Sequence, residues 1–345
     1  MSGSSRSLLT AEEWDKAVLA EGGHFLQSWR WGAFKARFGW QVERVSVADR
    51  DNIALAQILV QSRGPVSVGY VPRGPVVPAG ESRLAQDLMS KVDSRLRHRR
   101  ALYALIEPDQ PLPLSGTYKH HGFVAGTDHI QPARTVKVPL LPDEQLLAQM
   151  KQNTRYSVRL AVRKGVEIVR CGQGYDLTDF YQLLRETADR NAFSIHSEQY
   201  YRDFVDTFGQ DSLCLFARTS NNLAAALIAA KHGTEAIYMY GASSSQYRSS
   251  GAAFLLQFEA MKWARDVGCN RYDLWGIPAL DPVDVSTESG DFIASTKGND
   301  RRGLYRFKIG FGGEIVSYPP MLERRYSPVG SFLARRLTRR ADGDT

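Results

Sequence analysis

One lysine in a largely aromatic and apolar segment is the strongest candidate for chemistry. Lys308 stands in the sequence Gly-Leu-Tyr-Arg-Phe-Lys-Ile-Gly-Phe-Gly-Gly of residues 303–313, whose glycines allow close approach of the backbone. An ammonium group is costly to desolvate, so a lysine in such surroundings usually has a partner or a task. A preorganised cation can stabilise the oxyanion formed when an amine attacks an ester, by roughly 3 kcal/mol. The alternative is a lysine whose stem covers apolar surface while its ammonium group reaches solvent.

A second lysine follows a tryptophan-rich motif near the N-terminus. Lys35 ends the sequence Phe-Leu-Gln-Ser-Trp-Arg-Trp-Gly-Ala-Phe-Lys of residues 25–35. An ammonium group suits a phosphate as a point charge. The alternative is an exposed lysine on a helix.

A carboxylate and two tyrosines complete the set of isolated candidates. Glu107 ends the apolar run 101–107 and precedes Pro108. Its carboxylate could accept the proton of an attacking amine, or orient a bound peptide. Tyr238 and Tyr240 lie in an expected strand, where a site role and core packing are both open for either residue.

Basic residues recur at intervals of four between residues 151 and 163. The members of this basic stripe are Lys151, Arg155, Arg159 and Arg163. On a helix this spacing places them along one slowly drifting face, which can follow a phosphate backbone. A solvated face with salt bridges is the alternative.

The C-terminal tail is also rich in arginine. It carries Arg324, Arg325, Arg335, Arg336, Arg339 and Arg340. Apolar residues between them predict a short basic amphipathic helix, suited either to RNA or to an anionic membrane surface.

Composition limits the class of protein. The 345 residues include 44 basic and 37 acidic residues, giving a net charge of +7 that favours a polyanionic partner. The three cysteines form no CxxC pair, which argues against a disulfide framework or a metal site and suits a reducing cytoplasm. The chain has no apolar run of 18 residues and no signal-peptide pattern at its N-terminus, so we expect a cytoplasmic protein.

The order of expected elements repeats in the two halves of the chain. The first half predicts strands at 41–48, 53–60 and 66–71, a helix at 82–97 and a strand at 101–107. The second predicts helices at 144–165 and 176–192, strands at 213–217, 223–231 and 236–241, a helix at 252–267 and a strand at 271–276. A meander, a loop, a helix and a strand thus occur twice, which indicates an internal structural duplication.

The segments 25–35 and 303–313 together resemble the FemABX family of peptidyl transferases of cell-wall synthesis. The resemblance extends from Phe25 to Tyr318 and includes residues 153–166. It implies an α/β (α+β) fold of two tandem GNAT-like domains, with mixed, mainly antiparallel sheets flanked by helices and no coiled-coil arm. We expect the first domain at residues 1–147, completed by residues 317–345, and the second at residues 148–316.

The resemblance also implies a reaction. Such enzymes transfer an amino acid from aminoacyl-tRNA to an amine of the peptidoglycan precursor, which is lipid II or UDP-MurNAc-pentapeptide. No cofactor or metal is needed. We expect a monomer, with contact between the basic tail and the inner face of the plasma membrane as a further expectation.

Site residues follow by matching this sequence to the family motifs. Lys308 would stabilise the tetrahedral intermediate, Phe307 would shape the site, and Glu107 is a candidate base. The acceptor-binding candidates are Lys35, His196, Tyr200 and Tyr240. The tRNA-binding candidates are Lys151, Arg155, Arg159 and Arg163.

One position departs from the family pattern. His196 stands where the family has an arginine, four residues before the matching Tyr200. A neutral imidazole is a weaker partner for a phosphate or carboxylate than a guanidinium. The acceptor is therefore inferred from the family rather than from this residue.

Two other functions remain open at this point. Residues 248–253, Arg-Ser-Ser-Gly-Ala-Ala, fit the loose pattern by which GNAT enzymes bind the pyrophosphate of coenzyme A at a helix N-terminus. An acyl-CoA-dependent N-acyltransferase would use Arg248 and Gly251 in this way. A non-catalytic RNA- or membrane-binding module would instead depend on the arginine clusters and not on Lys308.

Overall fold

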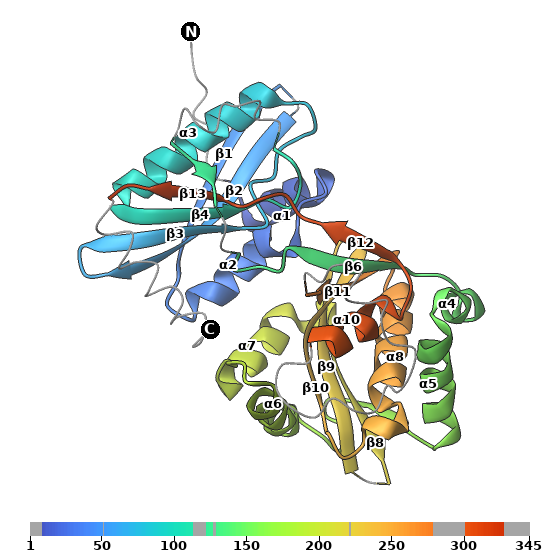
Figure 1. Cartoon of the computed structure of the whole chain (residues 1–345). Helices are drawn as coiled ribbons and strands as arrows, with labels where there is room; N and C mark the ends of the chain where they lie inside the picture. Colours follow the sequence, from blue (N-terminus) through green and yellow to red (C-terminus); the bar gives the residue numbers. More distant parts are fainter. Residues whose placement is uncertain are drawn as a thin grey trace. The chain divides into compact units, whose positions relative to one another are not determined.

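The computed structural model describes residues 9–50, 52–112, 122–126, 129–220, 222–278 and 301–327. They form two compact units (Figure 1). Unit 1 contains the described residues up to Gln131 and the segment that starts at Tyr318, and unit 2 runs from Pro132 to Ser317.

Unit 1 is built on a six-stranded sheet in the order β1-β2-β3-β4-β13-β5. The strands are β1 (Gln41–Asp49), β2 (Asn52–Arg63), β3 (Val66–Pro72), β4 (Ala101–Glu107), β13 (Leu322–Arg325) and β5 (Val124–Ala125). The pair β3 and β4 is parallel and the other pairs are antiparallel. Helix α3 (Ser82–His98) connects the parallel pair, as a crossover requires.

Side chains along β2 alternate between the two faces of this sheet, and a helix covers each face. Residues 54, 56, 58 and 60 pack against the apolar face of α3, whose Leu88 and Val92 are fully buried. Leu55 points to the opposite face, where it packs with Trp14 of α1 (Ala11–Ala20). Successive strand residues face opposite sides of a sheet, so β2 can bind a helix on each side.

The N-terminal motif is fixed by two buried glutamines. Gln27 ends the short 3-10 helix η1 (Phe25–Gln27) and donates from Nε2 to the Pro72 carbonyl at 2.7 Å. Gln57 of β2 donates its backbone N–H to Gln27 Oε1 at 2.8 Å and its side-chain amide to the Ser28 carbonyl at 2.9 Å. These bonds attach helix α2 (Trp29–Ala36), which carries Lys35, to the sheet.

Unit 2 contains a seven-stranded sheet in the order β12-β6-β11-β10-β9-β8-β7. The strands are β12 (Glu314–Ser317), β6 (Arg134–Pro139), β11 (Arg271–Gly276), β10 (Glu235–Ser243), β9 (Asn222–His232), β8 (Ser212–Thr219) and β7 (Glu167–Arg170). Only β10 and β11 of these neighbours pair in parallel. The expected mixed, mainly antiparallel sheets are confirmed.

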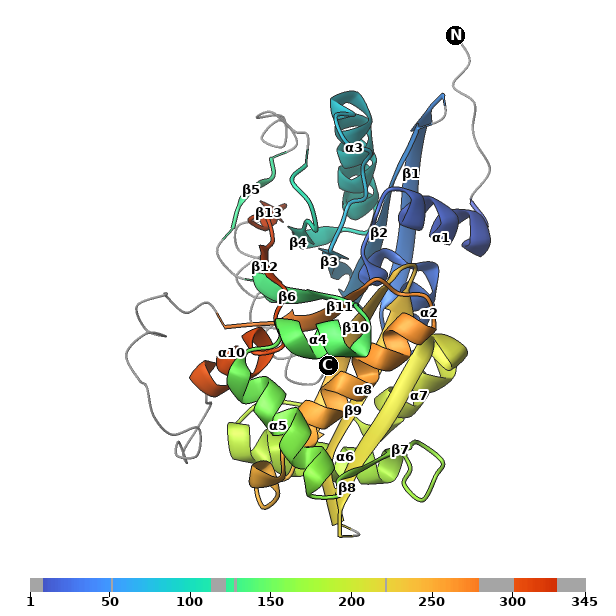
Figure 2. The same ribbon diagram turned by 90° about the vertical axis from the view of Figure 1, so that its right-hand side faces the viewer.

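Helices cover both faces of the second sheet (Figures 1 and 2). They are α4 (Asp143–Gln149), α5 (Gln152–Arg163), α6 (Leu177–Asn191), α7 (Glu198–Phe208), α8 (Ala252–Asp266) and α10 (Arg301–Ile309), with 3-10 turns η3 (Gly209–Asp211) and η4 (Arg248–Ser250). Helices α5 and α8 lie on one face, and α6 and α7 on the other. The longest helix of the described residues is α3, with 17 residues, so this part of the chain has no coiled-coil arm.

The structure divides the chain at a different residue from the one expected. Strand β6 pairs with β11 and β12, so unit 2 begins at Pro132 and the expected boundary after residue 147 falls inside it. The C-terminal segment returns to unit 1 from Tyr318, where β13 inserts between β4 and β5. The single helix expected at 144–165 is two helices, because Met150 between them is extended.

The basic tail falls mostly beyond the part described. Arg335, Arg336, Arg339 and Arg340 are outside the described residues. Arg324 lies 3.0 Å from Asp93 of α3, and Arg325 lies 2.6 Å from Glu323, so these two arginines have partners within unit 1. Across the described ranges, no helix has the length and apolar character needed to span a bilayer.

Candidate active site

Lys308 lies in the last turn of α10 and is almost completely buried, with 6% of its surface exposed. Its Nζ donates to the carbonyl oxygen of Gly276 at 2.8 Å. The same atom stands 5.5 Å from the centre of the Tyr238 ring. The ammonium group is therefore held by the Gly276 carbonyl and the face of the Tyr238 ring. The alternative, a lysine whose ammonium group reaches solvent, is wrong.

Burial changes the acidity of this lysine. Desolvation lowers the pKa of Lys308 from its ordinary value to about 8, and the negative charge of Asp273 acts in the opposite direction. At neutral pH most molecules still carry the charge. Lys308 is thus a buried cation that loses its proton within a range of pH open to experiment.

The glycines after Lys308 permit the close contacts that fix it. A Cβ atom on Gly310 would stand 2.1 Å from Oγ1 of Thr154, which belongs to α5. One on Gly313, where φ is +86°, would stand 2.3 Å from the carbonyl oxygen of Lys137. The backbone N–H of Lys151 also donates to the Gly310 carbonyl at 2.8 Å. Side chains at these positions would force the end of α10 away from α5 and β6.

Phe307 faces the core rather than a cavity. Its ring packs edge to face with Phe254 of α8 at 4.9 Å between centroids, and with Phe311 at 5.2 Å. These contacts anchor α10 one residue before Lys308. Phe307 thereby shapes the surroundings of the lysine through packing.

An irregularity in β10 separates its two tyrosines. The register with β9 shifts between Tyr238 and Tyr240, so these residues do not share a face as an unbroken strand would place them. Tyr238 lies against Lys308, whereas the Tyr240 ring packs 5.0 Å from Tyr201 and 5.3 Å from Phe204 of α7. One strand therefore contributes a tyrosine to each face of the sheet.

Three of the predicted acceptor-binding residues come together on the α7 face. The His196 and Tyr200 rings stack with centroids 3.6 Å apart and planes 8° apart. The hydroxyl of Tyr240 donates to the hydroxyl of Tyr200 at 3.5 Å. Burial raises the pKa of both tyrosines, so both hydroxyls are neutral donors. The stacked His196 adds a flat aromatic ring to this cluster.

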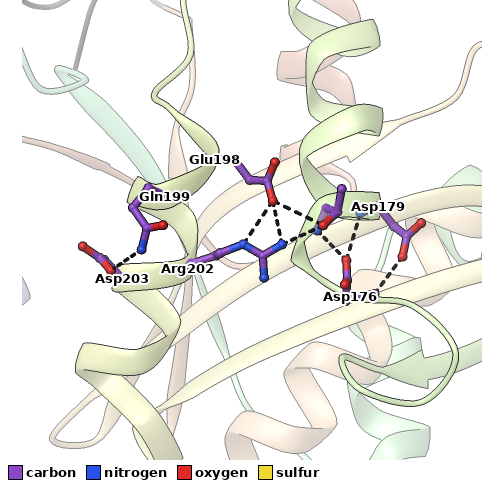
Figure 3. A network of polar contacts seen from close by, with 7 residues as sticks. Asp176, Asp179, Glu198, Gln199, Arg202 and Asp203 are labelled. Carbon is purple, nitrogen blue, oxygen red and sulfur yellow. Dashed lines mark hydrogen bonds and ion pairs between the residues drawn. The ribbon is translucent and has the colours of Figure 1, made fainter.

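A polar network links α6 to α7, the helix that carries Tyr200 (Figure 3). Arg202 donates from Nη2 to Glu198 on its own helix and to the Thr178 hydroxyl of α6, at 2.6 Å each. Asp176 caps α6 by accepting the Thr178 N–H at 2.6 Å. Gln199 donates to Asp203 at 2.8 Å on the adjacent side of α7. The network ties the start of α6 to α7 and so orients Tyr200.

Lys35 is buried in unit 1, with 7% of its surface exposed. Its Nζ stands 5.7 Å from the Trp31 ring and 5.8 Å from the Trp40 ring, in the range of cation–π contacts. Trp31 is in turn held by Phe25 and Phe34, at 5.6 and 5.5 Å between centroids. The alternative of an exposed helix lysine is thus wrong, because Trp31 of the motif and Trp40 after it lie against its ammonium group.

Glu107 has a structural role that the sequence did not indicate. Its carboxylate, 2% exposed, accepts from the Tyr70 hydroxyl at 2.5 Å. It also accepts from the backbone N–H groups of Ile130 and Gln131, at 2.8 and 3.1 Å. Nδ1 of His129 stands 3.6 Å away. Glu107 therefore holds the loop at the end of unit 1 in place, and a role as a base remains a prediction.

The basic stripe follows α5, but three of its four residues are exposed and one bonds within the chain. Lys151, Arg159 and Arg163 are exposed. Arg155 instead donates to the carbonyls of Ala148 and Met150, at 3.1 and 3.2 Å, where α4 ends. These bonds satisfy helix-end carbonyls, so Arg155 joins two helices and the other three are placed to meet an external anion.

The loop before α8 bonds within the chain. The N–H of Ser250 donates to the Tyr247 carbonyl at 3.0 Å, and the N–H of Ala252 donates to the Ser250 hydroxyl at 3.2 Å. A Cβ on Gly251 would stand 2.4 Å from the carbonyl oxygen of Ser157 in α5. The amides at this helix start are paired, and α5 lies against the glycine that a pyrophosphate would approach.

Two residues near Lys308 were missed from the sequence. Tyr238 was considered only as an alternative to Tyr240, and Asp273 was not considered. A fully buried aspartate in an otherwise aromatic and apolar strand was the signal available for Asp273. No three histidine, cysteine or acidic side chains gather as a metal site within the described residues.

Comparison with curated proteins finds relatives that share a name. A lipid II:glycine glycyltransferase of Staphylococcus haemolyticus is 25% identical, over 78% of this chain and 83% of that protein. The protein of the same name from Staphylococcus epidermidis is 24% identical, over 74% of this chain and 80% of its own length.

Solved structures show the same fold. The crystal structure of FemX superposes with a TM-score of 0.78 at 20% identity, covering 95% of this chain and 98% of that chain. A tandem GNAT protein from the clavulanic acid biosynthesis pathway gives a TM-score of 0.53 at 14% identity, covering 92% and 95%. These likenesses confirm the expected tandem GNAT-like architecture.

The sequence model of the FemAB family matches residues 9–116, 112–223 and 216–329. The match includes both the tryptophan-rich motif and the segment around Lys308, on which the resemblance was based. The chain belongs to the FemAB family.

Proposed function

We propose that this protein is an aminoacyltransferase that moves an amino acid from aminoacyl-tRNA to an amine of the peptidoglycan precursor. Membership of the FemAB family and the glycyltransferase names of its relatives support the reaction class. The observation that carries the proposal is the buried, protonated Lys308, held by a carbonyl and a ring. Such a group is suited to stabilise a negatively charged oxygen.

The reaction needs a stabilised oxyanion. The acceptor amine attacks the ester carbonyl carbon, a C–N bond forms, and the carbonyl oxygen becomes negative. Lys308 has three N–H donors and gives one to Gly276, so the others can meet this oxygen. Collapse of the intermediate breaks the bond to the ribose oxygen of the tRNA 3′ end. The attacking nitrogen releases its proton to solvent or to a base, for which Glu107 remains the candidate.

The predicted acceptor-binding residues of the two units offer different chemistry. In unit 2, the neutral hydroxyls of Tyr200 and Tyr240 and the face of His196 suit a sugar–peptide with polar and flat groups. In unit 1, Lys35 offers a point charge suited to the diphosphate shared by lipid II and UDP-MurNAc-pentapeptide.

The donor has a candidate surface on α5. Lys151 begins this surface and is bonded through its backbone to Gly310, so the exposed cations start beside the end of the helix that carries Lys308. Arg159 and Arg163 continue it along α5. This arrangement supports binding of the RNA phosphates near the reacting ester.

The acyl-CoA alternative has less support. Its pyrophosphate would need free amides at the start of α8, and those of Ser250 and Ala252 are paired. A non-catalytic module gives no reason to bury a lysine at the cost of desolvation.

The test is transfer of labelled amino acids from a charged tRNA pool to lipid II or UDP-MurNAc-pentapeptide in separate reactions. Acetyl-CoA replaces charged tRNA in a third reaction. Labelling that ribonuclease abolishes is the expected result, and it identifies both the amino acid and the acceptor. Turnover of acetyl-CoA without labelling from tRNA would contradict the proposal.

A further inference from the structure

We infer that Asp273 is a positioning residue for Lys308, which fixes the backbone carbonyl that Lys308 binds and places a buried carboxylate in the bulge that presents this carbonyl. The inference concerns the electrostatics of this site and, for its catalytic consequence, rests on the proposed function.

The first observation is the surroundings of the Asp273 carboxylate. Asp273 lies on β11 and is fully buried. Oδ1 accepts from the Trp275 N–H at 2.7 Å and from the hydroxyl of Thr135 on β6. Oδ2 accepts no hydrogen bond from any described residue, and Nζ of Lys137 stands 3.9 Å from it. A buried carboxylate oxygen without a hydrogen bond is costly unless its charge serves another group.

The second observation is the shape of the strand after Asp273. The register between β11 and β6 shifts between Asp273 and Gly276. Trp275, inside this bulge, has φ of +61°, a conformation that costs a residue with a side chain about 1–3 kcal/mol. The bond from the Trp275 N–H to Asp273 supports this conformation, and the next carbonyl, that of Gly276, binds Lys308. The Asp273 carboxylate thus shapes the bulge that presents the Gly276 carbonyl to Lys308.

The third observation is the charge balance around Lys308. The ionisable groups on β10, β11, β6 and α10 include Tyr238, Tyr272, Asp273, Lys137, Tyr305 and Arg306. Burial raises the pKa of Tyr238 to about 12 and raises the pKa of Tyr272 well above its ordinary value, so both phenols are neutral. Lys137 is paired with Glu235 at 2.8 Å. Among the described residues, Asp273 is the carboxylate whose charge raises the pKa of Lys308.

Neutralising Asp273 should lower the pKa of Lys308. Burial lowers the pKa of Lys308 and the charge of Asp273 opposes this, so neutralising Asp273 leaves the burial effect alone. Lys308 then loses its proton at a lower pH. An asparagine can still accept the Trp275 N–H, so Asp273→Asn removes the charge while retaining the bond that supports the bulge.

The test is a direct titration of Lys308 in the full-length protein without substrate. The ¹³Cε signals of labelled lysines are followed by NMR against pH, and the Lys308 signal is assigned by its loss in Lys308→Arg. We expect Asp273→Asn to lower the midpoint by about one pH unit. Asp203→Asn, the same change at another buried aspartate of unit 2, should leave the Lys308 midpoint unchanged.

Activity then gives a second readout. If the protein is the proposed transferase, the pH at which kcat declines on the alkaline side should fall by the same amount in Asp273→Asn. An unchanged Lys308 midpoint overturns the inference, whatever the activity. A shifted midpoint in a protein that transfers no amino acid supports the inference and contradicts the proposed function instead. If Asp273→Asn does not fold, Asp273→Ser, which is smaller and retains an accepting oxygen, is titrated in its place.

Discussion

At Lys308, burial and charge act in opposite directions on one ammonium group. Burial makes the cation less stable and lowers its pKa, while Asp273 raises it. The balance leaves the group charged at neutral pH and poorly solvated, which is the state in which a cation interacts most strongly with a new negative charge.

The pH dependence of kcat tests this state. The account predicts that kcat falls as pH rises through about 8, because Lys308 loses its proton there. The acceptor amine becomes neutral as pH rises, so the profile should be bell-shaped. The measurement is kcat at saturating substrates between pH 6 and 10. A rate that keeps rising through pH 10 would show that no charged Lys308 is required.

Sequence reasoning singled out Lys308, Lys35, and the pair of His196 and Tyr200 as candidates because each lies in a short motif. It could not choose between Tyr238 and Tyr240, since the bulge that sends them to opposite faces leaves no clear sign in the residues. Asp273 was missed for a related reason: Lys308 lies far along the chain, and nothing in the sequence of the strand indicates that the two residues come together.

At the scale of elements, the backbone after α10 lies very close to the backbone of β6. Gly313 and Gly172 both have positive φ, +86° and +88°. A Cβ on Gly313 would meet the Lys137 carbonyl at 2.3 Å, whereas one on Gly172 would meet nothing within 4 Å. The two positions therefore share backbone strain and differ in packing.

Replacing each glycine by alanine separates these effects. Gly313→Ala should lower the free energy of unfolding by about 2 kcal/mol more than Gly172→Ala, because only the first forces atoms apart. Urea denaturation of both variants measures the difference. Equal losses would mean that the contact between α10 and β6 relaxes without cost.

Helix α5 gives a second prediction at this scale. Arg159→Gln with Arg163→Gln should weaken tRNA binding and reduce the slope of log Kd against log salt by about 1–2, as lost phosphate contacts require. Arg155→Gln should leave the slope unchanged and lower the Tm, because Arg155 bonds to carbonyls of the chain. Fluorescence anisotropy with labelled tRNA at several salt concentrations measures both. If Arg155→Gln reduced the slope by the same amount, Arg155 would also contact RNA phosphates, contrary to this prediction.

Most elements of the two repeats were predicted near their observed bounds, because their strands alternate or are apolar and α3 has a clear amphipathic period. The break between α4 and α5 was missed, since neither glycine nor proline marks Met150. Strand β6 was also missed. It is short and becomes a strand through pairing with β11 and β12, which lie far away in the sequence.

At the scale of the whole molecule, a strand late in the sequence returns to the unit that holds the first elements. Strand β13 follows unit 2 in sequence but pairs with β4 and β5 of unit 1. Met321 and Leu322 are buried there. The duplication was visible in the order of elements, whereas the boundary at Pro132 depends on which sheet β6 joins, a non-local choice.

Truncating the chain tests whether unit 1 depends on β13. A chain ending at Ser317 loses β13 and exposes the edge of β4, so unit 1 should unfold at a lower temperature while unit 2 keeps its transition. A chain ending at Ser327 retains β13 and serves as the control. Differential scanning calorimetry follows both. An unchanged profile for the shorter chain would show that unit 1 does not need the strand.

The central claim is that Lys308 stabilises the transition state of aminoacyl transfer. Its most direct test is the single-turnover rate of transfer from charged tRNA to the acceptor, with tRNA and acceptor binding measured in parallel. Lys308→Ala should slow the rate by about 100- to 1000-fold with little change in binding. Lys262→Ala, which removes a half-buried lysine of α8 that pairs with Glu259, should react at the wild-type rate. A Lys308→Ala protein that is folded, binds both substrates and transfers at the wild-type rate would contradict the account.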